Sequence, residues 1–245
     1  MVDLSPLRRL PWHARRLFYL AGGPWLRCGV YERLGSLRYS RPALFDLEAV
    51  LDRHLPERDG VFIEAGAHDG YTQSNTYYLE RHRGWSGVLV EAIPELARTA
   101  ARRRPRSRVL NCALVAEEHA GPMVTMRFDD LMSTIAGSAA ERPEARGGRA
   151  HTGRRAYAVE VPARTLNAVF EEIAGREVDL LCLDLEGLEL EVLQGLDLDR
   201  HAPRYLLVEM LDHDRQRPAF DALLGARYEA AERASPYDVL YRRRA

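Results

Sequence analysis

The stretch "GVFIEAGAHDGYTQSNT", residues 60–76, decides how the fold of this chain is interpreted. It begins as a short apolar run and turns abruptly into a loop that contains Gly66 and Gly70. Loops of this kind, between a strand and a helix, commonly bind nucleotides because glycine lets the backbone approach the ligand closely. The loop has neither the G-x-G-x-x-G pattern nor the following lysine that would specify the nucleotide. The stretch therefore predicts a nucleotide-like cofactor without identifying it.

Further apolar runs follow the first and alternate with helical stretches. They are residues 87–92, 108–115, 178–184 and 204–210. Continuous apolar runs are expected where a sheet is buried on both faces, and segments such as 74–83 and 93–104 have the length and polarity of crossover helices. This order predicts an α/β fold over residues 58–245, with a doubly wound, mostly parallel sheet. Residues 226–233 and 237–244 alternate more and predict an antiparallel hairpin at one sheet edge.

The segments outside these strands carry two further predictions. Residues 1–57 have the pattern of helices in which aromatic side chains are interleaved with arginines, and eight arginines stand against Asp3 and Glu32 before residue 42. We interpret this segment as a helical cap that packs its aromatics on the main domain, and a membrane-surface or partner-binding helix is the alternative. Residues 137–156 contain almost no core residue, and we interpret them as a mobile lid over the site.

Composition limits the function. A chain of 245 residues, 46% of them hydrophobic, is expected to form one globular domain, and a net charge of -1 gives no reason to expect nucleic acid as a partner. All 35 basic residues are arginine, which excludes mechanisms that need a lysine amine. Cys28, Cys112 and Cys182 lack paired spacing and predict buried thiols in a reducing compartment. No apolar run is long enough to span a membrane, so we expect a cytoplasmic protein whose oligomeric state, including a homo-oligomer, stays open.

Acidic residues lie at or just after the ends of four predicted strands. They are Glu64, Glu91, Asp184 with Glu186, and Glu209 with Asp212. Because ligands of open α/β sheets bind beyond the carboxyl ends of the strands, we expect these side chains on one rim. Glu91 follows Gly70 by about 20 residues, where a carboxylate accepts hydrogen bonds from both hydroxyls of a ribose. Its charge disfavours the 2'-phosphate of NADP and leaves NAD open.

Glu64 distinguishes between the remaining cofactors. A carboxylate immediately before the loop would repel a pyrophosphate, so NAD is disfavoured. S-adenosylmethionine suits the site because it has a ribose for Glu91, an ammonium group near Glu64 and Asp184, and a carboxylate for the N–H groups at the helix start. A hydroxyl of Ser74 or Thr72 would add to the contacts of that carboxylate. The other predicted cofactor contacts are Gly66, His68, Gly70, Ala92 and Ala113.

Four segments carry a resemblance to a known family. They are "FIEAGAHDG", "SNTYYLE", "GVLVEA" and "LLCLDLEGLELEVLQG", and the pattern D-x-E-G-x-E-x-E-V-L is the most specific. Together they closely resemble the FkbM family of S-adenosylmethionine-dependent methyltransferases, from about residue 58 to the end of the sequence. The resemblance implies a Rossmann-like class I methyltransferase fold. It also implies O-methylation of a small molecule, since characterised members mostly methylate hydroxyls on secondary metabolites or sugars.

O-methyl transfer needs a base that takes the proton of the acceptor hydroxyl. We predict His213, just past the fifth strand, as this base, and Asp184 as the residue beside which transfer takes place; for His213 a loop histidine without a role is the alternative. Asp184, Glu209 and Asp212 could instead hold a Mg²⁺ ion that lowers the pKa of the hydroxyl, since hard oxygen ligands suit that ion.

Several alternatives stay open from the sequence. The chain could be a non-catalytic nucleotide-binding domain, or, less in keeping with Glu64, an NAD-dependent oxidoreductase. Glu189 and Glu191 are interpreted as the exposed surface of a helix. Nothing in the residues distinguishes a sugar hydroxyl from that of another secondary-metabolite intermediate as the acceptor.

Overall fold

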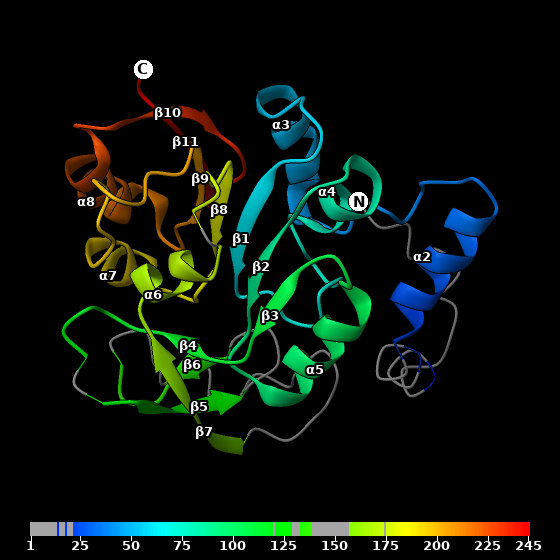
Figure 1. The fold of residues 1–245 in the computed structure, drawn as a ribbon, viewed down its shortest axis with the longest axis horizontal. Helices are drawn as coiled ribbons and strands as arrows, with labels where there is room; N and C mark the ends of the chain where they lie inside the picture. The colour runs from blue at the N-terminus through cyan, green and yellow to red at the C-terminus, as the bar shows by residue number, and fades with distance from the viewer. Residues whose placement is uncertain are drawn as a thin grey trace.

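A seven-stranded sheet forms the centre of the molecule (Figure 1). The computed structural model describes residues 14, 18, 22–119, 121–128, 133–138, 157–173 and 175–245. In spatial order the strands are β10 (Tyr228–Arg233), β11 (Asp238–Arg243), β9 (Tyr205–Glu209), β8 (Leu180–Leu183), β1 (Val61–Ala65), β2 (Ser86–Val90) and β3 (Arg108–Leu110). The last five run parallel, whereas β11 is antiparallel to both β9 and β10. The mostly parallel sheet and the C-terminal antiparallel hairpin are therefore confirmed.

The order of the strands reverses between β1 and β8. From β1 the chain proceeds outward through β2 to β3, and it later returns to place β8 and then β9 on the other side of β1. Ala65 at the end of β1 lies in register with Leu183 at the end of β8. Connections that diverge in this way leave a crevice beyond the carboxyl ends of the two strands, which is where ligands bind in such sheets.

Helices cover both faces of the sheet (Figure 1). One face carries α3 (Leu47–His54), α4 (Tyr77–Arg83) and α5 (Pro94–Arg103), and the other carries α6 (Leu166–Phe170), the short 3-10 helix η5 (Glu171–Ile173), α7 (Glu189–Gln194) and α8 (His213–Leu224). All five residues of β1 are buried, and successive side chains point to opposite layers. Phe62 belongs to the core with Leu51 and Leu79, while Ile63 belongs to the core with Phe220. The continuous apolar runs of the sequence thus result from burial on both faces.

A second sheet was not predicted. It has four strands, in the spatial order β4 (Ala113–Leu114), β7 (Tyr157–Arg164), β5 (Met123–Phe128) and β6 (Thr134–Ile135). The prediction of one strand over residues 108–115 is wrong, because β3 and β4 belong to different sheets. Between them, the side-chain amide of Asn111 donates hydrogen bonds to the backbone carbonyls of Glu91 (2.9 Å) and Ala92 (2.8 Å). These bonds tie the chain to the end of β2 at the point where it leaves the main sheet.

The N-terminal segment is helical in its described part. It contains α2 (Gly23–Arg33), the short 3-10 helix η2 (Leu44–Asp46) and α3. Tyr39 and Cys28 form a small buried cluster with Tyr71 and Tyr77 of the main domain, and the Tyr71 hydroxyl donates a hydrogen bond to the Tyr39 carbonyl at 2.7 Å. The fold therefore has the N-terminal helical cap that the sequence predicted, while the boundary at residue 57 remains a prediction.

Three smaller predictions concern the rest of the chain. Cys28, Cys112 and Cys182 are all free and buried. None of the helices within the described ranges combines the length and the apolar character that crossing a bilayer requires. Of the predicted lid at 137–156, all but its first two residues lie outside the residues that the structure describes.

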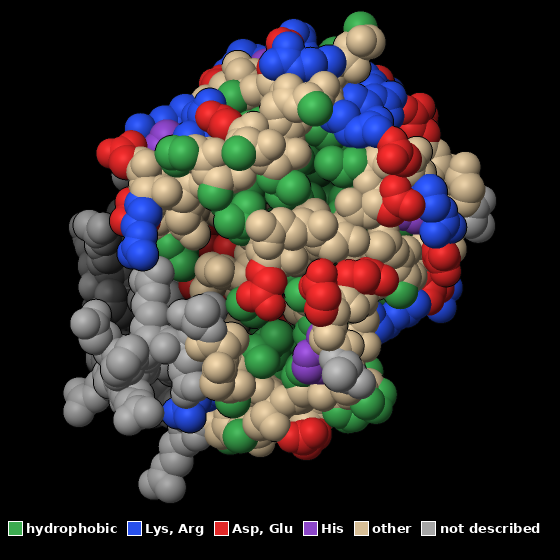
Figure 2. Space-filling model, turned by 90° about the vertical axis from the view of Figure 1, so that its left-hand side faces the viewer, with side chains coloured by type: hydrophobic (Ala, Val, Ile, Leu, Met, Phe, Trp, Pro, Cys, Tyr) green, Lys and Arg blue, Asp and Glu red, His purple; other side chains and the backbone are tan. Residues whose placement is uncertain are grey.

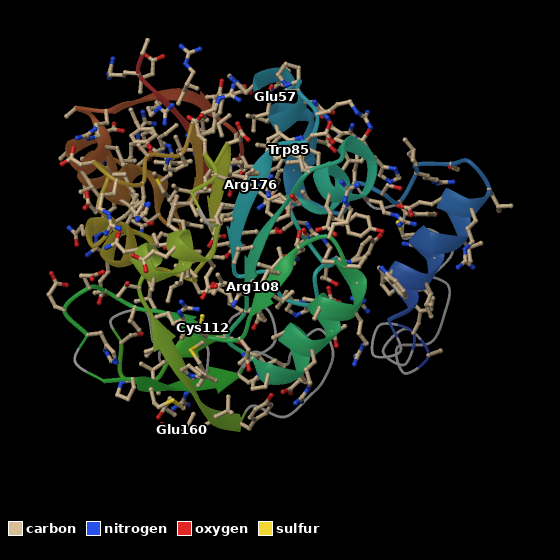
Figure 3. All side chains as sticks on the ribbon, viewed as in Figure 1. Glu57, Trp85, Arg108, Cys112, Glu160 and Arg176 are labelled. Carbon is tan, nitrogen blue, oxygen red and sulfur yellow. The ribbon has the colours of Figure 1, made fainter. Side chains whose placement is uncertain are left out.

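The amino ends of the strands are closed by packing. Trp85 is fully buried there and donates a hydrogen bond from its indole nitrogen to the Glu57 carbonyl at 3.1 Å (Figure 3). Gly60 lies against this ring so closely that an added Cβ would stand 2.7 Å from it. This end of the sheet is therefore structural, and the carboxyl ends remain for a ligand.

Candidate active site

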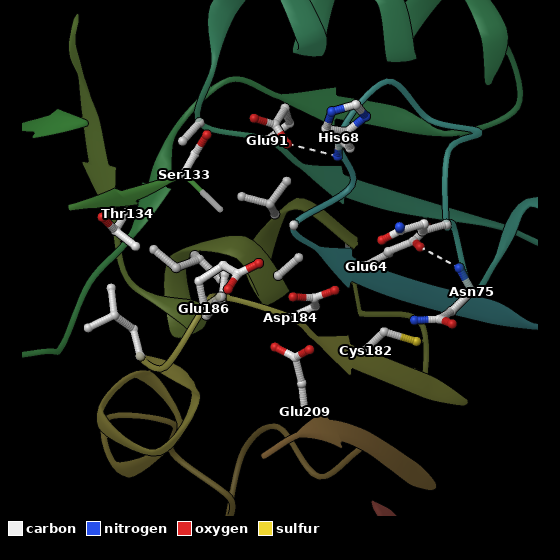
Figure 4. A pocket seen from close by; sticks show the side chains of 18 of the residues that line it. Glu64, His68, Asn75, Glu91, Ser133, Thr134, Cys182, Asp184, Glu186 and Glu209 are labelled. Carbon is white, nitrogen blue, oxygen red and sulfur yellow. Dashed lines mark hydrogen bonds between the residues drawn. The ribbon is translucent and has the colours of Figure 1, made fainter. Parts of the chain in front are cut away.

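A cavity of about 350 Å³ lies at the carboxyl ends of the central strands (Figure 4). It extends from Glu91 after β2, past Gly66 after β1 and Asp184 after β8, to Glu209 at the end of β9. Six acidic residues line it and no arginine of the described residues does; the acids are Glu64, Glu91, Asp184, Glu186, Glu209 and Asp238. The cavity therefore favours a ligand with positive charge.

A second hollow adjoins this cavity. It has a volume of about 420 Å³, reaches Val192 on α7, and shares Leu114, Ile135 and Leu188 with the main cavity. Figure 2 shows the molecule from the side of α7 and α8, where apolar side chains gather in depressions bordered by acidic ones. The apolar wall of the main cavity thus continues toward this surface.

The two glycines of the loop have different roles. Gly66 has a φ of 84°, and a Cβ added there would lie 2.0 Å from the carbonyl oxygen of Asp184. Only glycine lets the loop pass this close to the end of β8. Gly70 has a φ of 77° and packs against Ala100 of α5, where an added Cβ would meet the Ala100 Cα at 3.0 Å. Gly70 does not line the cavity, so its predicted contact with the cofactor is replaced by a role in folding the loop.

Glu91 is fixed by the backbone. Its carboxylate accepts hydrogen bonds from the N–H groups of His68 (2.8 Å) and Ile93 (2.7 Å). The residue is 7% exposed, and burial raises its pKa to about 7. Each carboxylate oxygen has a second lone pair, so ribose hydroxyls can still donate to it. Ala92 and Ala113 line the cavity nearby with the apolar side chain of Leu96, and together they form walls that suit a flat ring.

Glu64 is engaged by the loop that follows it. Its carboxylate accepts hydrogen bonds from the Ser74 hydroxyl (3.0 Å), the Asn75 N–H (2.8 Å) and the Thr76 hydroxyl, and it lies 3.6 Å from the guanidinium of Arg104. Glu64 lines the cavity, but Ser74 does not, and Ser74 is 2% exposed. The prediction that Ser74 contacts the cofactor is therefore corrected, since its hydroxyl holds Glu64 instead.

The other hydroxyl predicted near the cofactor carboxylate belongs to Thr72. Thr72 lines the cavity, although its hydroxyl donates to the Asp69 carboxylate at 3.0 Å. His68 also lines the cavity, with a left-handed φ of 48°, and its Nδ1 lies 3.7 Å from the Asp69 carboxylate. The loop thus places His68 and Thr72 at the cavity, and the Asp69 carboxylate contacts both side chains.

Three carboxylates meet on the other side of the cavity. Asp184, Glu189 and Glu209 each bring an oxygen atom within 4.8 Å of the others. Glu189 is fully buried and accepts hydrogen bonds from the N–H groups of Leu185 (2.7 Å) and Gly187 (3.0 Å). Its interpretation as helix surface is wrong, because it turns back to close the loop before α7.

Mutual repulsion perturbs this cluster. Burial and the nearby charge of Glu189 raise the pKa of Asp184 toward neutrality, against a hydrogen bond from Glu209. Burial, Asp184 and Glu186 raise the pKa of Glu209 further. The pKa values of both carboxyl groups are therefore raised, and the pair binds a proton more strongly than two exposed carboxylates would. Such carboxylates also have the oxygen ligands that suit Mg²⁺, and one buried oxygen of Glu209 has no hydrogen-bond partner among the described residues.

A family model matches the part of the chain that contains most of this site. The model described as the methyltransferase FkbM domain matches residues 64–228, more than half of the chain. The chain belongs to the FkbM family of S-adenosylmethionine-dependent methyltransferases. The match begins at Glu64 and includes the glycine loop, Glu91 and the three carboxylates of the cluster. The strand order and the family together give the Rossmann-like class I methyltransferase fold predicted from the sequence.

Several solved structures are similar to this chain at low sequence identity. An FkbM methyltransferase from Methylobacillus flagellatus KT is 15% identical, with a TM-score of 0.44 over 75% of this chain and 43% of that one. A methyltransferase from Aquifex aeolicus is 14% identical (TM-score 0.43, 83% and 92%), and an O-methyltransferase from Bacillus cereus in complex with SAH is 13% identical (TM-score 0.42, 80% and 77%). This chain spans less than half the length of the Methylobacillus protein. Comparison with the curated proteins gave no match.

Two predicted residues of the FkbM domain do not line the cavity. His213 begins α8, its Nδ1 lies 3.2 Å from the carboxylate of Asp214, and it does not line the cavity. A base must reach the proton it removes, so the prediction of His213 as base is corrected. Asp212 is exposed and caps α8 by accepting a hydrogen bond from the Arg215 N–H at 3.3 Å. Asp212 is therefore not one of the carboxylates that come together, and Glu189 is the third member of the group with Asp184 and Glu209.

Other residues line the cavity without having been predicted. They include Leu44 and Phe45 of η2, Gln73 and Asn75 of the loop, and Tyr237 and Asp238 near the start of β11. The loop residues could have been found from their nearness to Gly66 and Gly70. Leu44, Phe45 and Tyr237 carry no sequence signal, since they reach the FkbM domain from outside the matched residues.

Proposed function

We propose that this chain is an S-adenosylmethionine-dependent O-methyltransferase that acts on a hydroxyl of a small molecule, such as a sugar or another secondary-metabolite intermediate. The observation that carries the proposal is one continuous cavity with Glu91 at one end and the cluster of Asp184, Glu189 and Glu209 toward the other. A donor and an acceptor can meet in such a cavity without leaving it.

The donor fits the half of the cavity beside β1 and β2. Glu91 would accept hydrogen bonds from the ribose hydroxyls, and Ala92 and Ala113 would pack on the adenine. The methionine end would lie over Gly66, toward the carboxylates of Glu64 and Asp184, which suit its ammonium group. When bound, the donor supplies a methyl group activated by its sulfonium.

Asp184 is the proposed base. It lies at the end of β8, between the donor half and Glu209. Its pKa is raised by burial and by Glu189, so the carboxylate binds a proton more strongly than an ordinary aspartate does. Asp184 would accept the hydroxyl proton while the acceptor oxygen takes the methyl group from the sulfonium, whose S–C bond breaks to leave S-adenosylhomocysteine. A hydrogen bond between the Glu209 and Asp184 carboxyl groups would hold Asp184 in place.

A metal ion is the competing means of activating the hydroxyl. Asp184, Glu189 and Glu209 would hold Mg²⁺, and its charge would lower the pKa of a bound hydroxyl. The two mechanisms differ in one measurement. Removal of divalent cations with a chelator leaves turnover intact if Asp184 acts alone, and abolishes it, with recovery on added Mg²⁺, if the ion is required.

Two measurements test the proposed function. Calorimetric titration with S-adenosylmethionine should show binding, and release of S-adenosylhomocysteine should be detected with at least one hydroxylated compound from a panel of sugars and secondary metabolites. Binding without release from any compound would favour the non-catalytic alternative. The oxidoreductase alternative is set aside by the family. A cytoplasmic location is part of the proposal, because the three free thiols persist in a reducing compartment.

A further inference from the structure

An aromatic rim stands at one end of the cavity. Phe45 of η2 and Tyr237, just before β11, both line the cavity, and they are 51% and 45% exposed. Their ring centroids lie 5.9 Å apart, with an angle of 54° between the planes. A side chain that lines a cavity and also faces solvent stands at its mouth. The pair therefore meets at the mouth from opposite ends of the sequence.

The rim lies on the side of the cavity away from Glu91. The Met210 N–H, just after β9, donates a hydrogen bond to the Tyr237 carbonyl at 2.6 Å, which fixes Tyr237 beside the end of that strand. Asp238 pairs in register with Glu209. With the donor between Glu91 and Asp184, the space under the rim belongs to the acceptor, and in this respect the inference rests on the proposed function.

Phe45 is held in an unusual backbone conformation. Its φ is 54° and that of Asp46 is 56°, a left-handed region that bulky side chains rarely adopt. The turn is supported by Glu48, which is 3% exposed and accepts a hydrogen bond from the Ala43 N–H at 2.8 Å. Leu47 of the same turn is anchored in the core. Strain of this kind persists where the surrounding structure maintains it, and it is concentrated at functional sites.

We propose that Phe45 and Tyr237 select the acceptor by packing against an apolar ring or chain next to its methyl-accepting hydroxyl. Leu44 and Leu211 also line this part of the cavity and add apolar surface, while the carboxylates lie beside it. An acceptor with an apolar group removes the rim from water, whereas a wholly polar acceptor gains nothing there. Both rings lie outside residues 64–228. The family segment thus binds the donor, and the flanking segments determine which acceptor enters.

Matched sugar probes test this assignment. Methyl and phenyl glucoside, and methyl and phenyl galactoside, are titrated into the protein saturated with S-adenosylhomocysteine. Within a pair the sugar hydroxyls are the same and only the apolar group differs. The phenyl member should bind roughly tenfold more tightly or better, since a buried aromatic group contributes on this scale. Phe45→Gly, which suits the left-handed backbone, should abolish the preference, and Phe45→Tyr should retain it.

Leu37→Ala is the matched control, because Leu37 is 47% exposed and does not line the cavity. It should leave the phenyl preference unchanged. Equal binding of both members, binding of neither, or a preference that survives Phe45→Gly combined with Tyr237→Ala overturns the inference. Calorimetry with S-adenosylmethionine keeps the two proposals apart. Donor binding without a phenyl preference overturns only the role of the rim, and a phenyl preference without donor binding overturns the proposed function instead.

Discussion

The two halves of the cavity are built in different ways. Three residues of the donor half, Glu64, Gly66 and Glu91, come from one stretch of chain across β1 and β2. The acceptor half is assembled from η2, the ends of β8 and β9, and the turn before β11. A ligand shared by a whole family can thus be encoded by local sequence. Recognition of one acceptor depends on segments that only the folded chain brings together.

The halves also differ in how their carboxylates are satisfied. In the donor half, Glu64 and Glu91 accept hydrogen bonds from backbone N–H groups of the loop and the β2 end. In the acceptor half, Asp184 and Glu209 lie close together, and the charge of neighbouring carboxylates raises the pKa of each. Burial raises the pKa of Glu91 against these hydrogen bonds, whereas the charges of neighbouring carboxylates add to burial at Asp184 and Glu209. The chemistry is therefore expected in the acceptor half.

The largest expected effect is that of Asp184→Asn. The amide cannot accept the hydroxyl proton, so turnover should fall by roughly 10²–10⁴-fold, while the dissociation constant of S-adenosylmethionine changes far less. The measurement is the rate of S-adenosylhomocysteine release from the best acceptor of the panel. Glu191→Gln, on the exposed side of α7, is the control and should retain full activity. If Asp184→Asn retained its turnover, another group would have to accept the proton of the acceptor hydroxyl.

The second prediction concerns the support of the donor half. Arg104 is 1% exposed and binds Glu80 (2.8 Å), Ser74 (3.0 Å) and Thr76 (2.8 Å), with Glu64 at 3.6 Å. Arg104→Met leaves buried carboxylates without their cation. The free energy of unfolding should fall by about 3–5 kcal/mol in urea denaturation. A loss below about 1 kcal/mol would mean that the loop does not depend on this arginine.

Arg102→Met is the matched control. Arg102 lies two positions earlier and is exposed, and within the described part of the chain its guanidinium donates a hydrogen bond only to Thr99. Its replacement should change the free energy of unfolding by no more than about 0.5 kcal/mol. The contrast between the two arginines measures how far the donor half relies on buried charge.

The same contrast explains what the sequence could predict. The parallel sheet, the hairpin and the approach of Glu64, Gly66, Glu91 and Asp184 follow from apolar runs and from acids at strand ends, which are local signals. The second sheet was missed because its strands are short or alternate in burial, as β5 does. Phe45 was missed because its position depends on tertiary support and not on its neighbours in sequence. His213 begins α8 and does not line the cavity, and its place just past a strand end could not show this from the sequence.

The third prediction is that Glu91→Ala weakens binding of S-adenosylmethionine at least tenfold. Each hydrogen bond from a ribose hydroxyl to the charged group contributes about 1.5–3 kcal/mol. Calorimetry measures the dissociation constant, and circular dichroism confirms that the variant is folded. Glu117→Ala serves as the control, since Glu117 is exposed and lies outside the cavity. Unchanged affinity in the folded variant would contradict the assignment of Glu91 as the residue that binds the ribose.

The last prediction concerns the dependence of stability on pH. Glu91 has a pKa of about 7 in the folded chain, against an ordinary value of 4.5, and the pKa values of Asp184 and Glu209 are raised as well. A raised carboxyl pKa means that the folded state holds its proton more tightly than the unfolded chain does. The stability that this proton gives is complete below pH 4.5 and is lost as the pH rises through the folded pKa.

The free energy of unfolding should therefore decrease between pH 5 and pH 9, by about 2–3 kcal/mol for Glu91 alone at 1.36 kcal/mol per pKa unit. Urea denaturation at a series of pH values measures the decrease. Glu91→Gln should remove the part of this decrease that comes from the donor half, and Asp184→Asn the part that comes from the acceptor half. The two parts should add, because the groups belong to different hydrogen-bond networks. Saturating S-adenosylmethionine should reduce the decrease by placing its positive charge among these carboxylates. A flat profile, or one that rises with pH, would show that the pKa values of these carboxyl groups are not raised in the folded chain. The division of the cavity into a binding half and a proton-accepting half would then lose its electrostatic basis.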